Sequence, residues 1–378
     1  MKMKIGIDAR FYGAKNKGLG RYTEKLIQEL EKIDKKNHYF IFLRKDNYSD
    51  YHPSNKNFQK VLADFPWYSL KEQIFFPRLL YKLQCDLVHF LHFNVPLMYK
   101  RSFIVTIHDL TLFHFPTHKN STHNWLWYKI KYKTYHWMMK KIIQKAQKII
   151  TISNFTANDI KKYFGNKIAG KIKVIYEAPS IFIKKEKFSY LKKKYAIKIP
   201  YLLYVGNAYP HKNLERLVDA FQIFKKQFPQ YSLVLVGKND FFYQRLKKYI
   251  KLKKIDSIII VDTLTDKELK TIYQKADLFI FPSLYEGFGL PPLEAMAENL
   301  PVISSQHGCM QEILGESVVY FNGKDVDNMV EVMINVIKNV KLRNKLKEKG
   351  KEQIKKYNWK KTALDTFKVY SGFKKNEK

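Results

Sequence analysis

Short apolar runs of four or five residues alternate with longer amphipathic segments along nearly the whole chain. In the first half, strand-like runs are found at 4–8, 39–43, 87–91, 103–107, 148–152 and 173–176. In the second half, they are found at 201–205, 232–236, 258–261, 278–281 and 302–304. Segments such as 21–33 and 214–228, with apolar residues at helical spacing, lie between them. Because strands joined by crossover helices build parallel sheets, the sequence predicts an α/β chain with two doubly wound parallel sheets.

The pause in this alternation at 177–200 marks the predicted domain boundary. This stretch contains Pro179, several lysines and Pro200, and it shows little strand-like alternation. We therefore place one domain at 1–178 and the second at 179–356. With 378 residues and 46% hydrophobic residues, the chain is long and apolar enough for two packed cores.

Positive charge dominates the composition, with 69 Lys and Arg against 34 Asp and Glu and a net charge of +35. A strongly basic chain invites phosphate-rich partners such as nucleic acid or anionic lipid. Only eight of the basic residues are Arg, however, and base readout favours the Arg fork. The excess is spread evenly, with +19 in residues 1–178 and +16 in the rest. We interpret most of it as a solvated surface bias and do not expect nucleic acid as a partner, although a basic nucleic-acid-binding protein stays the alternative.

The spacing of the two cysteines and the absence of long apolar runs indicate in which cellular compartment the chain works. Cys85 and Cys309 lie far apart without CxxC or His-rich spacing, so we expect neither a disulfide framework nor a structural zinc site. No run approaches the roughly 18 apolar residues of a membrane span, and the start MKMKIGIDAR does not read as a signal peptide. We expect a cytoplasmic protein that is not integral to a membrane.

Loops that follow strands should carry the functional residues, because ligands on such sheets bind at the carboxyl ends of the strands. A loop with Gly18 and Gly20 follows the first strand, and Arg21 opens the next helix. Small residues there let backbone N–H groups approach an anion, although a flexible surface turn is the alternative. Lys212 lies in the loop after 201–205, where it can reach a phosphate and stabilise a departing diphosphate; one more surface lysine is the alternative.

The string PSLYEGFGLPPLEAMA at 282–297 follows another strand and is the most informative one. An anion could be bound by the backbone amides of its turn, which are those of Gly287, Phe288, Gly289 and Leu290. Glu286 lies in the turn and Glu294 about one turn into the helix, so both can face one bound molecule. Carboxylates beside an anion-binding turn can accept hydrogen bonds from neutral hydroxyls, as on a sugar and a ribose. The alternative for Glu294 is a simple interaction with the helix dipole.

His108 ends the strand at 103–107 and is followed by Asp109. A histidine at a strand's carboxyl end, next to a carboxylate, can exchange hydrogen bonds with a substrate near neutral pH. A satisfied core histidine is the alternative.

Together these strings resemble a known enzyme family. IGIDARFYG…GLGRYTEKL, TIHDLTLFHFP, IITISNFTANDI, YVGNAYPHKNLERLVDAF and FPSLYEGFGLPPLEAMA are similar to segments of the retaining, nucleotide-sugar-dependent glycosyltransferases of family GT4. The resemblance covers nearly the whole chain in order, and Glu286 and Glu294 match the family's E-x7-E motif. It implies the GT-B fold, in which two Rossmann-like domains face each other across a cleft. A GT-B-fold epimerase or phosphorylase matches these strings less well.

The resemblance implies a donor site in the domain 179–356. Glu294 would bind the nucleotide ribose, Glu286 and the amides after it the donor sugar, and Lys212 the diphosphate. Many family members carry an Arg five residues before this Lys, where this chain has Asn207. The missing charge could come from Arg21, Arg216 or His211.

The base pocket is expected in the loops after 232–236 and 258–261, including Thr263 and Leu264. The donor we expect is GDP-mannose, with a UDP-sugar as the alternative. No metal or other cofactor is expected, because positive side chains and helix ends would take the leaving-group charge. Retention would proceed through an oxocarbenium-like species with same-face attack by the acceptor hydroxyl.

The resemblance also implies that the domain 1–178 binds the acceptor, and that the helix at 357–378 packs back on it. The loop with Gly18 and Gly20 would approach the diphosphate, and His108 would contact the donor sugar near the reacting carbon. The acceptor would be a glycan or lipid-linked glycan in the synthesis of cell-surface polysaccharide or lipopolysaccharide.

Residues 119–148 hold six Trp and Tyr and eight Lys without an acid, which suits a helix on an anionic membrane. The stripe Trp125, Tyr128, Tyr132, Tyr135 and Met139 equally suits a crossover helix that packs on the sheet. Peripheral binding to the inner face of the cell membrane is therefore one of two open hypotheses.

Overall fold

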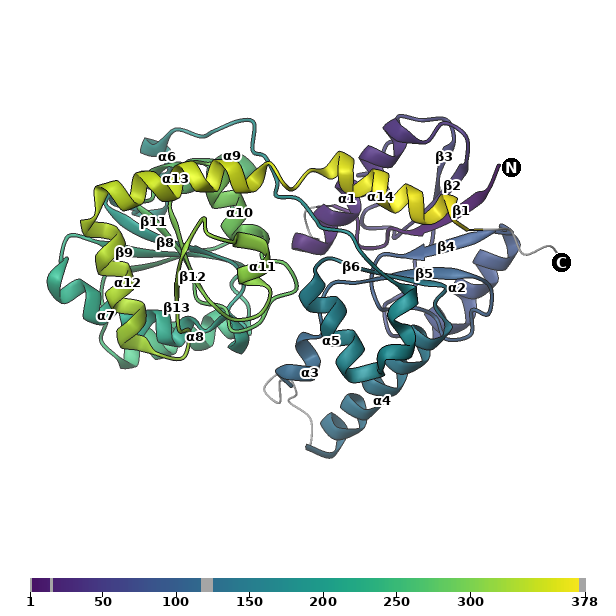
Figure 1. Cartoon of the computed structure of the whole chain (residues 1–378), viewed down its shortest axis with the longest axis horizontal. Helices are drawn as coiled ribbons and strands as arrows, with labels where there is room; N and C mark the ends of the chain where they lie inside the picture. Colours follow the sequence, from purple (N-terminus) through teal and green to yellow (C-terminus); the bar gives the residue numbers. More distant parts are fainter. Residues whose placement is uncertain (1, 14–15, 117–124, 374–378) are drawn as a thin grey trace. The chain divides into compact units, whose positions relative to one another are not determined.

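Figure 1 shows the computed structural model, which describes residues 2–13, 16–116 and 125–373. The chain divides into two compact units, the first formed by 1–177 with 358–378 and the second by 178–357. These bounds lie one residue from the ones that the sequence predicts.

The first unit is built on a seven-stranded sheet of order β3-β2-β1-β4-β5-β6-β7 in which all described pairs are parallel. Its strands are β1 (Lys4–Asp8), β2 (His38–Leu43), β3 (Phe58–Leu62), β4 (Leu87–Phe90), β5 (Phe103–Ile107), β6 (Lys148–Thr151) and β7 (Ile172–Val174). Its helices are α1 (Lys17–Ile33), α2 (Leu70–Lys82), α3 (Thr111–His114), α4 (Trp125–Lys145), α5 (Asn154–Phe164) and α14 (Trp359–Ser371), with a 3-10 turn η3 (Asn166–Lys171). Asp8 pairs with Phe90 in the register of β1 and β4, so the loops that leave these strands begin at one edge.

The second unit is built on a six-stranded parallel sheet of order β10-β9-β8-β11-β12-β13. Its strands are β8 (Tyr201–Val205), β9 (Ser232–Val236), β10 (Ile258–Val261), β11 (Leu278–Phe281), β12 (Val302–Ser305) and β13 (Val319–Phe321). Its helices are α6 (Phe188–Tyr195), η4 (Pro210–Lys212), α7 (Leu214–Gln227), α8 (Phe241–Leu252), α9 (Asp266–Lys275), α10 (Leu290–Ala297), α11 (Met310–Leu314), α12 (Val326–Lys338) and α13 (Val340–Ile354). The chain order reverses between β8 and β11, which makes the carboxyl ends of these two strands the topological switch point where ligands bind in such sheets.

Helices cover both faces of the first unit's sheet. On one face α2, α4 and α5 contribute side chains such as Phe76, Met139 and Ile160 to a common core. On the other face α1 and α14 contribute Leu26, Ile27 and Tyr370. Figure 1 shows α14 beside α1, with which it is in contact, although α1 ends at Ile33 and α14 begins only at Trp359. The C-terminal helix thus lies with the first unit.

Part of the aromatic stripe on α4 packs on the sheet. Met139 is fully buried, and Tyr135 packs its ring against Phe93 and Phe113. Trp137 points to solvent and is 53% exposed. For these residues the crossover-helix interpretation holds, whereas the side chains at 125–131 and the segment 117–124 lie outside the described part of the chain. None of the described helices is both long and apolar enough to span a bilayer.

Candidate active site

An ion pair joins the loops that leave the two central strands of the second unit. Nζ of Lys212, in the turn η4 after β8, lies 2.5 Å from Oε1 of Glu286, in the loop after β11. The two side chains are 14% and 13% exposed, so the pair is largely screened from water but still reachable. β8 and β11 are neighbours in the sheet, which explains why residues 74 positions apart meet at the switch point. The structure therefore brings together two residues that the sequence assigned to the donor site.

The turn after Glu286 is held by buried apolar contacts. Gly289 has φ +89° and precedes α10, and the two prolines of Leu290–Pro291–Pro292 occupy the first helical turn, where a missing N–H costs nothing. Phe288 is buried and lies edge-on against Tyr357, with ring centroids 5.3 Å apart. The side chain of Phe288 is thus an anchor for the turn, and a ligand would meet the backbone there.

Glu294 lies in α10 with only 5% of its surface exposed. The hydroxyl of Tyr273, from α9, donates a hydrogen bond of 3.2 Å to its Oε2. A buried carboxylate in the second turn of a helix gains little from the helix dipole. The burial therefore needs another explanation than the dipole, and the predicted ribose contact is one.

The loop before Lys212 is fixed by two tyrosine hydroxyls that the sequence did not indicate. Tyr204 donates to the carbonyl oxygen of Asn207 at 2.8 Å, and Tyr243 donates to that of Gly206 at 2.9 Å. A Cβ at Gly237 would lie 2.0 Å from the Gly206 oxygen, so only glycine fits after β9. These contacts fix the backbone of the loop without a ligand. The side-chain oxygen of Asn207 turns back to its own loop and accepts a 3.4 Å contact from the amide of Tyr209.

The residues proposed for the base pocket lie on an edge strand. Thr263 and Leu264 follow β10, and β9 separates this strand from β8. Thr263 is exposed, and both its N–H and its hydroxyl bond to Asp262. These two residues thus follow a strand that lies two positions from β8 in the sheet order.

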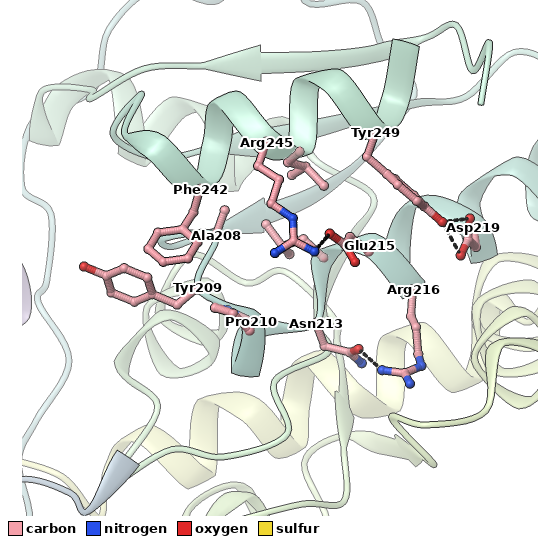
Figure 2. Close-up of a pocket in the computed structure, with 12 residues that line it drawn as sticks. Ala208, Tyr209, Pro210, Asn213, Glu215, Arg216, Asp219, Phe242, Arg245 and Tyr249 are labelled. Atoms are coloured by element: carbon pink, nitrogen blue, oxygen red, sulfur yellow. Dashed lines mark hydrogen bonds and ion pairs between the residues drawn. The ribbon is translucent and has the colours of Figure 1, made fainter. Parts of the chain in front are cut away.

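A cavity of about 330 Å³ lies beside the β8 loop, between α7 and α8. Figure 2 shows Tyr209, Phe242 and the ion pair of Arg245 with Glu215 at 2.9 Å around it. Neither Lys212 nor Glu286 lines it, whereas Arg216 and Asn213 do. Arg216, one candidate for the missing cation, donates to Oδ1 of Asn213 at 2.8 Å.

In the first unit, the two glycines predicted for an anion-binding loop are helical. α1 begins at Lys17, so Gly18 and Gly20 lie in its first turn and Arg21 lies beyond it. The prediction of a loop that ends at Arg21 was wrong. A Cβ at Gly20 would come within 2.0 Å of the carbonyl oxygen of Gly13, whereas nothing lies within 4 Å of one at Gly18. Close backbone packing therefore requires glycine at position 20, and only Gly18 leaves an open approach.

His108 follows β5 and bonds through both ring nitrogens. Its Nδ1 lies 2.9 Å from Oε1 of Glu177 and its Nε2 lies 2.9 Å from the carbonyl oxygen of Leu91. Burial lowers the pKa of His108, but the hydrogen bond and the charge of Glu177 outweigh it, and the pKa is raised above its usual value. A carbonyl and a carboxylate both accept, so the imidazolium form of the ring, with two N–H donors, satisfies both partners. The predicted contact of His108 with a donor sugar would replace one of these bonds.

Glu177 is a residue that the sequence analysis missed. It is the last residue of the first unit before the chain enters the second, and 5% of its side chain is exposed. The carbonyl oxygen of the neighbouring Tyr176 accepts a 2.8 Å hydrogen bond from the hydroxyl of Thr362, near the point where the chain returns to the first unit.

Among the residues that the structure describes, no group of three or more His, Cys, Asp or Glu side chains could hold a metal ion.

Comparisons with known proteins agree with this architecture. Residues 16–178 match the family "Glycosyltransferase Family 4" and residues 187–353 match "Glycosyl transferases group 1". The O-antigen chain mannosyltransferase RfbU of Salmonella typhimurium is 29% identical over 62% of this chain and 60% of its own length. The O-antigen chain mannosyltransferase B of Escherichia coli is 25% identical over 74% of this chain and 72% of its own. The chain thus spans less than two thirds of RfbU.

Solved structures share the fold at low identity. Sucrose-phosphate synthase from Thermosynechococcus elongatus superimposes with a TM-score of 0.78 at 20% identity, over 98% of both chains. The HepE protein of Anabaena in complex with UDP-glucose gives 0.74 at 16% identity, over 98% of this chain and 100% of its own. Two family matches in order along nearly the whole chain, on two parallel-sheet units, show that the chain belongs to the GT4 glycosyltransferases with the GT-B fold.

Proposed function

We propose that this chain is a retaining, metal-independent glycosyltransferase. It moves a hexose from a nucleotide-diphospho-sugar to a hydroxyl of a glycan or lipid-linked glycan in the synthesis of cell-surface polysaccharide. The names of RfbU and mannosyltransferase B support mannose as the sugar, with GDP-mannose as donor. HepE was solved with UDP-glucose, which keeps a UDP-sugar as the alternative. Both cysteines are buried free thiols in the described chain, which supports the reducing cytoplasm as the compartment.

The ion pair of Lys212 with Glu286 is the observation that carries the proposal. A largely buried cation and carboxylate can be separated at low cost only if each receives a new partner. A nucleotide-diphospho-sugar brings both partners on one molecule. Its hydroxyls donate to Glu286, and its diphosphate accepts from Lys212. A simple anion or a simple sugar would leave one of the two charges unpaired.

The same exchange serves the chemistry that we propose. As the bond from the anomeric carbon to the diphosphate breaks, negative charge grows on the leaving oxygen, and Lys212 stabilises it in a rigid, partly desolvated site. Glu286 holds the sugar by its hydroxyls, and Glu294 holds the ribose. The acceptor hydroxyl attacks from the face that the diphosphate leaves, and a diphosphate oxygen takes its proton. The configuration is retained, and no nucleophile from the protein is required.

A thermal-shift panel of GDP-, UDP- and ADP-sugars tests the proposal. We expect one donor to raise the melting temperature of the wild type, by about 2–4 °C at a hundredfold excess over Kd. Glu294→Ala should abolish this shift. Glu298→Ala is the matched control, because Glu298 is equally buried at the end of the same helix but pairs with Lys270.

Three outcomes decide between the parts of the proposal. If no nucleotide-sugar stabilises the wild type, or if the control variant loses the shift as fully as Glu294→Ala, the donor site is not where we place it. Transfer that EDTA abolishes would contradict metal independence. A product whose anomeric proton shows inverted configuration by NMR would contradict retention.

A further inference from the structure

The exposed face of α2, in the first unit, combines apolar and basic side chains. Leu70 is 81% exposed, Phe75 45% and Ile74 37%. Lys71, Arg78 and Lys82 are exposed on the same helix. At 100° per residue, these six positions fall within an arc of about 140°, with Leu70 at one border and Phe75 at the other. The opposite side of the helix is buried against the sheet, through Phe76 and Leu80.

The exposed face carries no negative charge. Glu72 is the one acid of α2, and it is fully buried, with its Oε1 2.6 Å from Nη1 of Arg10. Its Oε2 accepts a 2.7 Å bond from the amide of Tyr68, a residue just before the helix that is 60% exposed. The acid therefore orients the helix start and leaves the outer face purely apolar and cationic.

The face continues past the C-terminal half of α2 onto the loop between β4 and β5. The hydroxyl of Tyr81 contacts the carbonyl oxygen of Met98 and accepts a hydrogen bond of 2.9 Å from the amide of Lys100. Met98 is 57% exposed. The guanidinium of Arg101 lies 5.3 Å from the centre of the Tyr81 ring. Lys100 and Arg101 are themselves exposed. Two further cations and one further apolar side chain thus adjoin the helix.

We propose that this face of α2, with Tyr68 and Met98, is a docking surface for an anionic lipid bilayer. Apolar side chains interleaved with Lys and Arg fit the acyl–headgroup boundary, where the chains sink and the cations meet lipid phosphates. A protein partner would have to bring acids to every cation, whereas a bilayer with acidic lipids offers them all over its surface. The proposal concerns α2 alone: Tyr135 of α4 packs on the sheet, and the α4 side chains at 125–131 lie outside the described part of the chain. It does not depend on the transferase proposal, since vesicle binding requires no donor.

Flotation of the full chain with vesicles tests it. We expect binding to phosphatidylcholine vesicles that contain 30% phosphatidylglycerol, and weak binding to phosphatidylcholine alone. Each cation at such a surface contributes about fivefold to binding, so a rise from 50 to 300 mM salt should weaken it. Leu70→Glu with Phe75→Glu should reduce the partition coefficient by about a hundredfold or more, because two apolar anchors are lost and two like charges are gained.

The chain offers a matched control in the second unit. Leu252 is 81% exposed and Phe241 56%, at the two ends of α8. Leu252→Glu with Phe241→Glu therefore has the same composition and net charge as the α2 variant, and we expect it to bind like the wild type. Circular dichroism of both variants shows whether each is folded, and Lys71→Gln with Arg78→Gln, which spares the apolar residues, should still lower binding about 25-fold.

Several results would overturn the inference. The wild type could fail to bind anionic vesicles, or the α2 and α8 variants could lose binding equally, which would assign binding to the overall charge. If the wild type instead forms a dimer that the α2 variant dissolves, with no vesicle binding, the face joins two copies of the chain.

Discussion

Replacing Glu177 with Gln removes a charge next to His108 but keeps an oxygen that can accept the bond from Nδ1. The second nitrogen stays bonded to the carbonyl oxygen of Leu91 at 2.9 Å. The variant thus tests the charge of the pair with little change in shape. Both side chains are mostly buried, 16% exposed for His108 and 5% for Glu177, so solvent screens the interaction only weakly.

The expected magnitude follows from a second histidine in the same unit. His89 is fully buried and bonds to the hydroxyls of Tyr370 and Thr106, and burial together with the charge of His108 lowers its pKa to about 3. His108 is raised above its usual value in spite of burial, because Glu177 opposes the desolvation. In Glu177→Gln the negative charge that offsets desolvation is gone. The pKa of His108 should therefore fall below about 6.5, in the direction of the His89 value.

The sign of the effect on stability depends on pH. A histidine whose folded pKa is raised adds stability that is fully present below its unfolded pKa of about 6.5 and is lost as pH rises through the folded pKa. In the variant the folded pKa is lowered, so stability is lost as pH falls below about 6.5. We therefore expect Glu177→Gln to cost about 3 kcal/mol at pH 5.5, as for a buried pair that loses one partner, and about 1 kcal/mol or less at pH 9.

Two measurements check this prediction. Proton–carbon NMR of the imidazole Cε1–H signals, with His108→Gln for assignment, follows the titration of His108 directly. Urea unfolding at pH 5.5 and pH 9 follows stability. Glu316→Gln, which removes a 90% exposed carboxylate from a pair with Lys349, is the control and should change neither. A stability loss that is independent of pH, or an unchanged His108 titration, would refute the reasoning.

Two packing predictions address the first unit. Gly20→Ala should destabilise it by about 3 kcal/mol or more, because the new Cβ would lie 2.0 Å from the carbonyl oxygen of Gly13. Gly18→Ala, two residues earlier and with nothing within 4 Å of its new Cβ, should be neutral or stabilising by about 0.5–1 kcal/mol. Thermal melts of both variants, followed by circular dichroism, compare them, and equal melting temperatures would contradict the packing argument. Tyr370→Phe removes the hydroxyl that lies 2.7 Å from Nδ1 of buried His89 and should cost about 1–3 kcal/mol in urea unfolding, and a variant as stable as the wild type would show that the bond contributes nothing.

The alternation of apolar runs predicted most of the fold because central strands are buried on both faces. β8 and β9 read as unbroken apolar runs and lie in the interior of their sheet. The strands that the analysis missed, β3 (Phe58–Leu62) and β13 (Val319–Phe321), are edge strands. An edge strand is partly open to solvent, and β3 carries Gln59 and Lys60 within its five residues, so it leaves no apolar run to find.

The start of α1 shows how tertiary contacts override propensity. Glycine disfavours a helix by about 1 kcal/mol relative to alanine, and Asn16 offers no side-chain cap, so the sequence placed the start at Arg21. In the structure the helix begins at Lys17 and contains both glycines. The backbone at Gly20 packs so closely against the carbonyl oxygen of Gly13 that only glycine fits at this helical position. No local pattern encodes that contact.

The residues of the candidate site also fall into those that local sequence patterns predict and those that only tertiary contacts reveal. Glu286 and Lys212 could be found because each lies in a loop directly after a strand, where parallel sheets present their ligand-binding residues. Glu177 lies in an irregular segment 69 positions from His108, and Tyr243 fixes the Gly206 loop from a helix 37 positions away. These residues act through long-range contacts, and only the folded arrangement of the loops reveals them.

A uniform positive potential and a locally neutral site have different effects on an anionic ligand. The net charge of +35 attracts every anion, and it therefore raises encounter rates without distinguishing a nucleotide-sugar from phosphate or nucleic acid. The pair of Lys212 with Glu286 carries no net charge, and an anion alone can take Lys212 only by leaving a mostly buried carboxylate without its counterion. A ligand that also supplies hydroxyl donors avoids this penalty. In the donor site that we propose, discrimination would therefore reside in the neutral pair, and the large charge of the chain would account at most for attraction.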